Sequence, residues 1–116
     1  IRIKLGHNTQ PRFLEYKYSF DSLIQDFENE EKHPVDIGLV VVWTMGGREK
    51  NGYQIISTLL PEYKDRRRYH GFTHEVFYDI TGNGKFDCIV LEELIDYLNN
   101  SNEYVEKYRD LYSEEW

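Results

Sequence analysis

The sequence predicts an α/β or α+β fold with a mixed β-sheet, a core helix after the second strand, and helices at the C-terminal end. Residues 36–43, "DIGLVVVW", are apolar almost without interruption and rich in β-branched side chains, which is typical of a strand buried on both faces. A strand-like segment at 12–18 and a helix-like segment at 20–30 come directly before it. This order of strand, helix and buried strand is typical of a crossover connection between parallel strands.

The N-terminal segment predicts a β-hairpin. Ile1, Ile3 and Leu5 alternate with basic residues, which is the period of a strand with one face in water. The segment "GHNTQP" at 6–11 has the composition of a turn. The second strand is expected at 12–18, where large apolar side chains alternate with charged ones.

The next segment predicts the core helix. Ser19 is a suitable N-cap, because its hydroxyl can accept a hydrogen bond from the first turn of a helix. Apolar side chains follow at i, i+3, i+4 and i+7, namely Phe20, Leu23, Ile24 and Phe27. The pattern fades in an acidic run before Pro34, so the helix is expected over 20–30. The buried strand that follows is expected to lie in the centre of the sheet.

The second half of the sequence predicts further strands and then two helices. Residues 53–58 indicate a weaker strand, and 72–80 and 85–90 flank the glycine-rich "TGNG", so a hairpin is expected there. Two groups of apolar side chains at helical spacing follow, separated by Asn99 and Asn100. The groups are Leu91, Leu94, Ile95 and Leu98, then Tyr104, Val105, Tyr108, Leu111 and Tyr112.

The composition indicates one globular domain over residues 1–116. The hydrophobic content of 40 % includes ten Tyr, six Phe and two Trp, which supply bulky core material. No stretch is long enough to span a membrane, and the single Cys88 favours a reducing compartment, so a cytoplasmic location is expected. The chain opens on Ile1 without a leader, which favours a piece of a longer protein.

The charge distribution gives opposing indications about nucleic-acid binding. The net charge of −7 opposes non-specific binding to a phosphate backbone. Basic residues nevertheless concentrate in "KDRRRYH" at 64–70, where Arg66, Arg67 and Arg68 are the candidates for contacting nucleic acid. The alternative interpretation of this run is a solvated loop.

Two sequence patterns resemble metal sites without meeting their requirements. The segment that begins at Asp79 is spaced like a calcium loop, but its twelfth position is Val90 where the loop needs a bidentate Glu. We therefore expect a hairpin turn at 79–87 that binds no calcium. His70 and His74 have the spacing of a zinc pair on a helix, but they lie in a strand-like segment, so a satisfied or exposed histidine is expected.

The candidate catalytic residues are Glu15 and Lys17. On a strand, residues i and i+2 share a face, so this carboxylate and this ammonium lie side by side. A carboxylate can hold Mg²⁺ against a scissile phosphate, while a neighbouring lysine positions the attacking water or offsets negative charge. The alternative interpretation is a polar ion pair on a half-buried strand.

The segment "LEYKYSFDSLIQDFENEEKHPVDIGLVVVW" resembles the PD-(D/E)XK, or restriction-endonuclease-like, superfamily, and in particular the nuclease-like tail domain of large bacterial GHKL-type ATP-binding proteins. The resemblance covers about residues 1–60. It implies that Glu15 is the second metal-binding carboxylate, that Lys17 is the catalytic lysine and that Mg²⁺ is the cofactor. The first acid of the superfamily would fall at or just before Ile1, and within the chain that region offers only His7 and Asn8.

Two functions therefore stay open at this stage. The first is Mg²⁺-dependent phosphodiester hydrolysis of nucleic acid by Glu15 and Lys17, with the three arginines steering the backbone. The second is a non-catalytic module that keeps a nuclease-like fold and pairs with itself, as a homodimer, or with another domain of its parent protein through its many tyrosines. The environment of the Glu-x-Lys pair favours the first, whereas the acidity and the missing first acid favour the second.

Overall fold

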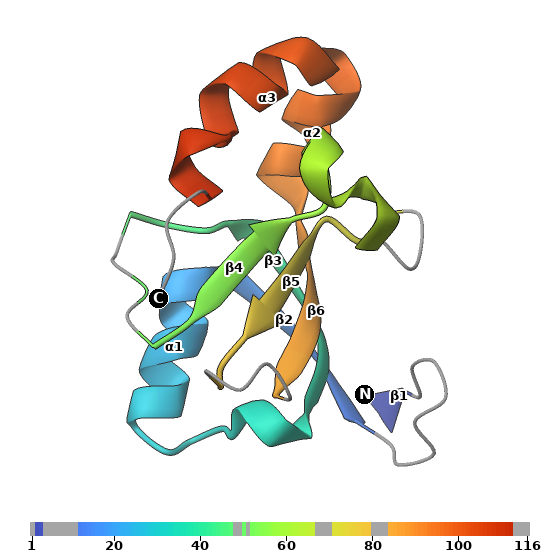
Figure 1. The fold of residues 1–116 in the computed structure, drawn as a ribbon. Coiled ribbons are helices and arrows are strands. Elements are labelled where there is room, and N and C mark those ends of the chain that lie inside the picture. The colour runs from blue at the N-terminus through green and yellow to red at the C-terminus, as the bar shows by residue number, and fades with distance from the viewer. Residues whose placement is uncertain are drawn as a thin grey trace.

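The computed structural model describes residues 2–3, 12–47, 50, 52–66, 71–79 and 84–112. Within these residues, six strands form one mixed sheet in the order β1-β2-β3-β6-β5-β4, with a helix on one face and two helices stacked beyond one end (Figure 1). The strands are β1 (Arg2–Ile3), β2 (Arg12–Ser19), β3 (Ile37–Thr44), β4 (Gln54–Ser57), β5 (His74–Phe77) and β6 (Lys85–Val90). The helices are α1 (Phe20–Glu28), α2 (Leu91–Asn99) and α3 (Ser101–Tyr108), with short 3-10 turns η1 (Pro34–Asp36), η2 (Pro61–Arg66) and η3 (Asp110–Tyr112).

The predicted crossover unit is confirmed. β2 and β3 are parallel neighbours, and α1 connects them. Ser19 ends β2 and caps α1, since its Oγ accepts a hydrogen bond from the backbone N–H of Ser22 at 3.2 Å. The predicted N-terminal hairpin is confirmed for residues 2–3, which pair antiparallel with Arg12 and Phe13. Residues 4–11 lie outside the described part of the chain.

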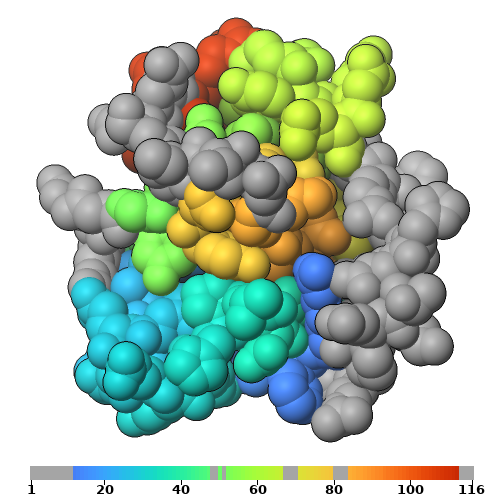
Figure 2. Space-filling model, turned by 60° about the horizontal axis from the view of Figure 1, so that its bottom comes forward, coloured from blue at the N-terminus to red at the C-terminus, as the bar shows by residue number. Residues whose placement is uncertain are grey.

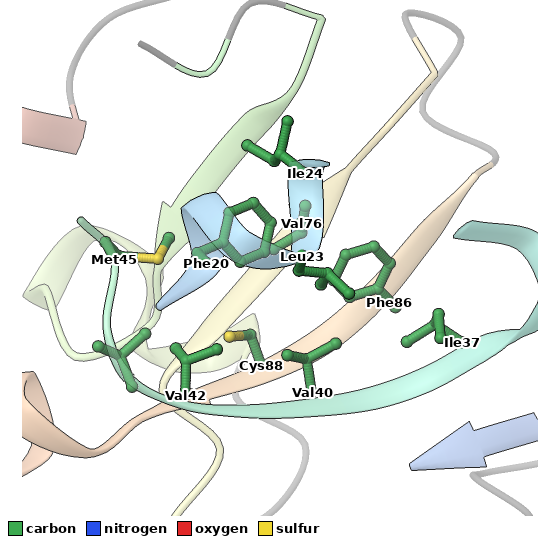
Figure 3. Packing of buried hydrophobic residues seen from close by; sticks show 11 residues of the cluster. Phe20, Leu23, Ile24, Ile37, Val40, Val42, Met45, Val76, Phe86 and Cys88 are labelled. Atoms are coloured by element: carbon green, nitrogen blue, oxygen red, sulfur yellow. The ribbon is translucent and has the colours of Figure 1, made fainter. Parts of the chain in front are cut away.

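The main core lies between α1 and the sheet. Figure 3 shows Phe20, Leu23 and Ile24 of α1 gathered over side chains of β3, β5 and β6. The core side chains of the sheet are Ile37, Val40, Val42, Val76, Phe86, Cys88 and Val90, and Met45 follows β3. Because β3 lies third in the strand order and is buried over most of its length, its predicted central position is confirmed.

The predicted hairpin at 72–80 and 85–90 is also confirmed, since β5 and β6 pair antiparallel. Residues 80–83 of its turn lie outside the described part of the chain. The face of β5 opposite the main core carries Glu75, which is buried beneath Arg66 of η2 and Lys85 of β6. Figure 2 shows the same layering, with α1 and η1 (cyan to teal) on one side of β5 and β6 and η2 (yellow-green) on the other.

The C-terminal helices break where the sequence predicts. α2 ends at Asn99, and the side chain of Asn100 caps α3 by accepting hydrogen bonds from the N–H groups of Asn102 and Glu103, each at 3.1 Å. The last predicted helix differs in one respect, because it ends at Tyr108 and continues only as the 3-10 turn η3. This tighter turn brings the hydroxyl of Tyr112 onto a buried carboxylate of α2.

A glycine after β3 fixes the connection towards β4. Gly46 has φ +82°, and a Cβ added there would lie 2.1 Å from Oδ2 of Asp21 in the first turn of α1. The same carboxylate pairs with Lys50, whose Nζ lies 3.0 Å from Oδ1. Gly46 therefore lets the chain pass close to α1 in a conformation that other residues rarely adopt.

We expect Gly46→Ala to lower the free energy of unfolding by about 1–3 kcal/mol, because it adds left-handed backbone strain and displaces Asp21. Gly47→Ala is the matched control, since its added Cβ meets open space and should change stability by less than about 0.5 kcal/mol. Urea denaturation followed by circular dichroism measures both. Equal effects of the two substitutions would contradict the role assigned to Gly46.

Candidate functional site

Glu15 and Lys17 lie together on the face of β2 that α1 covers. Their neighbours in the register are Val40 and Val42, both part of the main core. The two side chains pair with other residues and not with each other, which corrects the alternative interpretation of an ion pair between them. Lys17 Nζ lies 2.6 Å from Oδ2 of Asp26, and Glu15 Oε2 lies 2.6 Å from Nζ of Lys32.

These four side chains form a charge-neutral cluster that we call the β2–α1 ion cluster: Glu15, Lys17, Asp26 and Lys32. Asp26 joins its two halves, because Lys32 Nζ is also 3.7 Å from Oδ2 of Asp26. The ion pair with Lys17 lowers the pKa of Asp26, although partial burial opposes the shift. The pKa of Lys32 is raised chiefly by its hydrogen bond to Glu15. The exposed fraction of the four side chains is only 13–27 %.

The β2–α1 ion cluster does not fit the magnesium ion that the family resemblance implies. Each carboxylate already faces an ammonium group at 2.6 Å, so a divalent cation would add two positive charges to a neutral cluster and displace a lysine. Among the described residues, no three or more His, Cys, Asp or Glu side chains come together as a metal-binding group. The Glu15 carboxylate is therefore occupied by a partner from its own chain.

The opposite face of β2 carries the second candidate site. Tyr16 and Tyr18 are 62 % and 73 % exposed, and Trp43 on β3 is 40 % exposed. Tyr16 lies beside Val41 in the register, and Leu91 at the start of α2 also lines this surface. Together they line an open hollow of about 310 Å³, which we call the aromatic groove. Its lining residues are Tyr16, Lys17, Tyr18, Val41, Val42, Trp43 and Leu91.

A second polar cluster lies at the junction of the sheet and the C-terminal helices. Glu93 of α2 is 2 % exposed, and its Oε1 lies 3.1 Å from Nε2 of His74 and 2.7 Å from the hydroxyl of Tyr104. Tyr112 donates a hydrogen bond to Oε2. Burial by itself would raise the pKa of Glu93, but His74 and the two tyrosine hydroxyls outweigh it and lower that pKa.

We call Glu93, His74, Tyr104 and Tyr112 the Glu93 cluster. Further hydrogen bonds connect it to the sheet on two sides. Thr73 Oγ1 lies 2.5 Å from Nδ1 of His74, and Ser57 Oγ lies 2.5 Å from the hydroxyl of Tyr104. β4, β5, α2, α3 and η3 thereby share one hydrogen-bonded network. Its members are buried or nearly so, which identifies the cluster as a structural junction.

Sequence reasoning expected a satisfied or exposed histidine at position 74, and His74 is buried and hydrogen-bonded. It missed Glu93. The signal that could have found Glu93 is the spacing of Tyr104, Tyr108 and Tyr112, which predicts hydroxyls on one face and so indicates nearby acceptors. Tyr104 and Tyr112 donate to Glu93, whereas Tyr108 donates to Asp96.

The remaining predicted site residues do not gather at Glu15 and Lys17 in the described part of the chain. Arg66 Nε pairs with Oε1 of the buried Glu75 at 2.5 Å, beyond the opposite face of the sheet. Arg67 and Arg68 lie outside the described residues, as do positions 80–83 of the calcium-like segment. Cys88 is fully buried, and this burial raises the pKa of its thiol, which disfavours a reactive thiolate.

Comparisons with known proteins find no match: no family model, no curated protein and no solved structure resembles the chain. The resemblance to the restriction-endonuclease-like superfamily therefore stays a prediction from the sequence pattern. Of the helices in the described ranges, none is both long and apolar enough to cross a membrane.

The lowered pKa of Glu93 predicts a defined pH dependence. The folded state holds this proton less tightly than the unfolded chain, whose carboxyl has the ordinary pKa of 4.5. The contribution of Glu93 to stability is therefore complete above that value and is lost as the pH falls through the lower folded pKa. We expect Glu93→Gln to cost roughly 2–3 kcal/mol near neutral pH, and the difference from wild type to shrink below about pH 4.

Chemical denaturation of both proteins at several pH values measures this difference. Glu92→Gln is the matched control, because Glu92 neighbours Glu93 on α2 but is outside the buried cluster. A Glu93→Gln cost that is the same at acidic and neutral pH would contradict an ionised buried Glu93.

Proposed function

We propose that this chain is a non-catalytic protein-interaction module that binds its partner through the aromatic groove. One observation carries the proposal, namely the contrast between the two faces of a single strand. Glu15 and Lys17 are engaged by Lys32 and Asp26, whereas Tyr16 and Tyr18 of the same strand are exposed. The polar face of β2 thus stabilises the fold through its ion pairs, and the aromatic face is available for binding.

The aromatic groove has the chemistry of a protein-binding surface. Tyrosine and tryptophan combine a large apolar area with a polar tip, and they are enriched in the buried centres of protein interfaces. Tyr18 and Trp43 lie on adjacent parallel strands of a hydrogen-bonded sheet, so the backbone that carries these side chains is fixed before a partner arrives. Such preorganisation lowers the entropic cost of association.

The charge of the chain favours a protein over a nucleic acid as the partner. Aromatic side chains also stack on bases, but single-stranded nucleic acid needs a basic groove along its backbone. The net charge is −7, and Lys17, which lines the aromatic groove, directs its ammonium group to Asp26. Arg66 is likewise committed to Glu75.

Metal-dependent hydrolysis of nucleic acid is the second candidate. It is favoured by the β2–α1–β3 crossover unit, which holds Glu15 and Lys17 adjacent on one face, as the nuclease resemblance requires. This function would need Lys32 to leave Glu15 and a further acid to come from outside the described residues. The β2–α1 ion cluster makes the first requirement costly, because Lys32 would have to give up its ion pair with Glu15.

Alanine substitutions in the ion cluster separate the two functions. We expect that the purified protein does not cleave DNA or RNA with Mg²⁺ or Mn²⁺. We also expect that Lys17→Ala and Glu15→Ala change only the stability of the fold. Lys17→Ala should cost about 1–2 kcal/mol because it leaves the largely buried Asp26 with only the longer Lys32 contact, and Glu15→Ala less than about 1 kcal/mol. Cleavage that depends on metal and disappears in Glu15→Ala would establish the nuclease instead.

Radical footprinting of the protein in its native host tests the binding surface. Relative to the purified chain at low concentration, we expect oxidation of Tyr18 and Trp43 to fall several-fold, because a bound partner excludes water from the aromatic groove. Val35, 62 % exposed at the opposite end of β3, is the internal control and should keep its reactivity. Unchanged labelling of Tyr18 and Trp43 would exclude a stable partner at this surface.

A further inference from the structure

Helix α2 turns an apolar face outward. Leu91, Ile95 and Leu98 follow one another at i, i+4 and i+7, and they are 37 %, 46 % and 72 % exposed. None of the three belongs to a hydrophobic cluster of the described residues. The apolar face of a helix in a globular protein normally lies against the core, so this exposed face, which we call the α2 stripe, is a candidate contact surface.

The buried carboxylate of the same helix fixes this orientation. Neighbouring residues of an α-helix are turned about 100° apart around its axis. The three residues of the α2 stripe are two before, two after and five after Glu93, so they point about 140–200° away from it. Turning the stripe inward would remove Glu93 from its hydrogen bonds in the Glu93 cluster. The outward direction of the stripe therefore follows from contacts inside the fold.

The α2 stripe continues the aromatic groove. Leu91 belongs to both, and it lines the hollow together with Trp43 of β3. From Leu91 to Leu98 the stripe runs along α2 for about 10 Å, beyond the end of the sheet (Figure 1). Rows of side chains at helical spacing pack into the grooves of another helix. A helix lying along the stripe could therefore also place one large apolar side chain in the aromatic groove.

We propose that the partner of this surface is a basic amphipathic helix of another protein, which packs its apolar face along the α2 stripe and inserts an apolar side chain into the aromatic groove. The inference rests on the proposed function, since it names the kind of partner that the aromatic groove binds. It extends that surface from the sheet onto α2.

The charges beside the α2 stripe favour a basic partner. Glu92 and Asp96 lie on one flank of the stripe, each directly after one of its apolar residues. Lys107 offsets Asp96 in part, since its Nζ lies 3.4 Å from Oδ2 of that carboxylate. The whole chain adds a net charge of −7. Lysine or arginine side chains that flank the apolar face of a partner helix would be attracted by these carboxylates, which accelerates association and fixes the orientation of the partner.

A second copy of the chain and a lipid surface fit less well. A second copy would bring a further net charge of −7 to the same surface, and a high net charge of one sign keeps proteins monomeric. Helices that lie on membranes carry Lys or Arg beside their apolar face, where α2 has Glu92 and Asp96. An anionic lipid surface would repel these carboxylates. The charges thus favour a basic protein segment over both.

Fluorescence anisotropy of a labelled peptide tests the proposal on the whole chain. The probe is a peptide of about 18 residues, with leucine at helical spacing and lysine at the other positions. It should bind with a Kd of roughly 10 µM or tighter. A peptide with glutamate in place of each lysine should bind at least about tenfold more weakly, because like charges then face each other. A peptide of the original composition, ordered so that no apolar face forms, should lose a similar factor.

Substitutions in the α2 stripe locate the binding site. Ile95→Gln combined with Leu98→Gln should weaken binding of the basic peptide about tenfold, because both apolar contacts are lost. Glutamine is a good helix former and both positions are exposed, so α2 should stay folded, which circular dichroism checks. Val35→Gln is the matched control. It removes a comparably exposed apolar side chain just before β3, at the end of that strand away from α2, and should leave the affinity within about twofold.

Equal binding of the basic and acidic peptides overturns the proposal, as does an affinity that the double substitution leaves unchanged. Binding to vesicles of anionic lipid that the double substitution abolishes would assign the stripe to a membrane instead, and a dimer that it abolishes would assign the stripe to a second copy. If the basic peptide fails to bind while Tyr18 and Trp43 are protected in the host, the basic helix is wrong and the interaction module stands.

Discussion

The alternation of side chains along β2 is the constraint on which both candidate surfaces depend. Glu15 and Lys17 point towards α1 because Val40 and Val42, their neighbours on β3, must reach the core under that helix. A slip of one residue would bury Tyr16 and Tyr18 and expose the charged pair. The register that places the hydrophobic core correctly therefore also presents the aromatic side chains to solvent.

The polar face of β2 is compatible with the core only because its charges are neutralised locally. Asp26 and Lys32 come from the end of α1 and from the segment after it, and they close the β2–α1 ion cluster with two carboxylates and two ammonium groups. A partly buried carboxylate without such a partner would destabilise the fold. Glu15 and Lys17, which suggest a nuclease edge in the sequence, thus have a structural role that explains their presence. Their ion pairs take the place of apolar packing at the rim of the core.

Sequence reasoning succeeded where the physical cause is local and failed where it is distant. The helix at 20–30 and the strand at 36–43 follow from short-range periodicity, and the capping residues Ser19 and Asn100 lie directly before their helices. The partner of Glu15 is 17 residues away, at Lys32, and no sequence period connects them. Likewise, the acceptor role of Glu93 depends on how β5, α3 and η3 converge on α2.

Occupation of Glu15 by Lys32 distinguishes a structural ion cluster from a metal-binding edge. A Mg²⁺ titration of the protein, followed by NMR of the Glu15 carboxyl and the Lys32 ammonium, reports on this occupation. We expect no saturable change at either group up to about 10 mM Mg²⁺, since binding would require breaking the 2.6 Å ion pair. Saturable binding at Glu15 below about 1 mM, with release of Lys32, would show instead that Glu15 holds the metal of a nuclease.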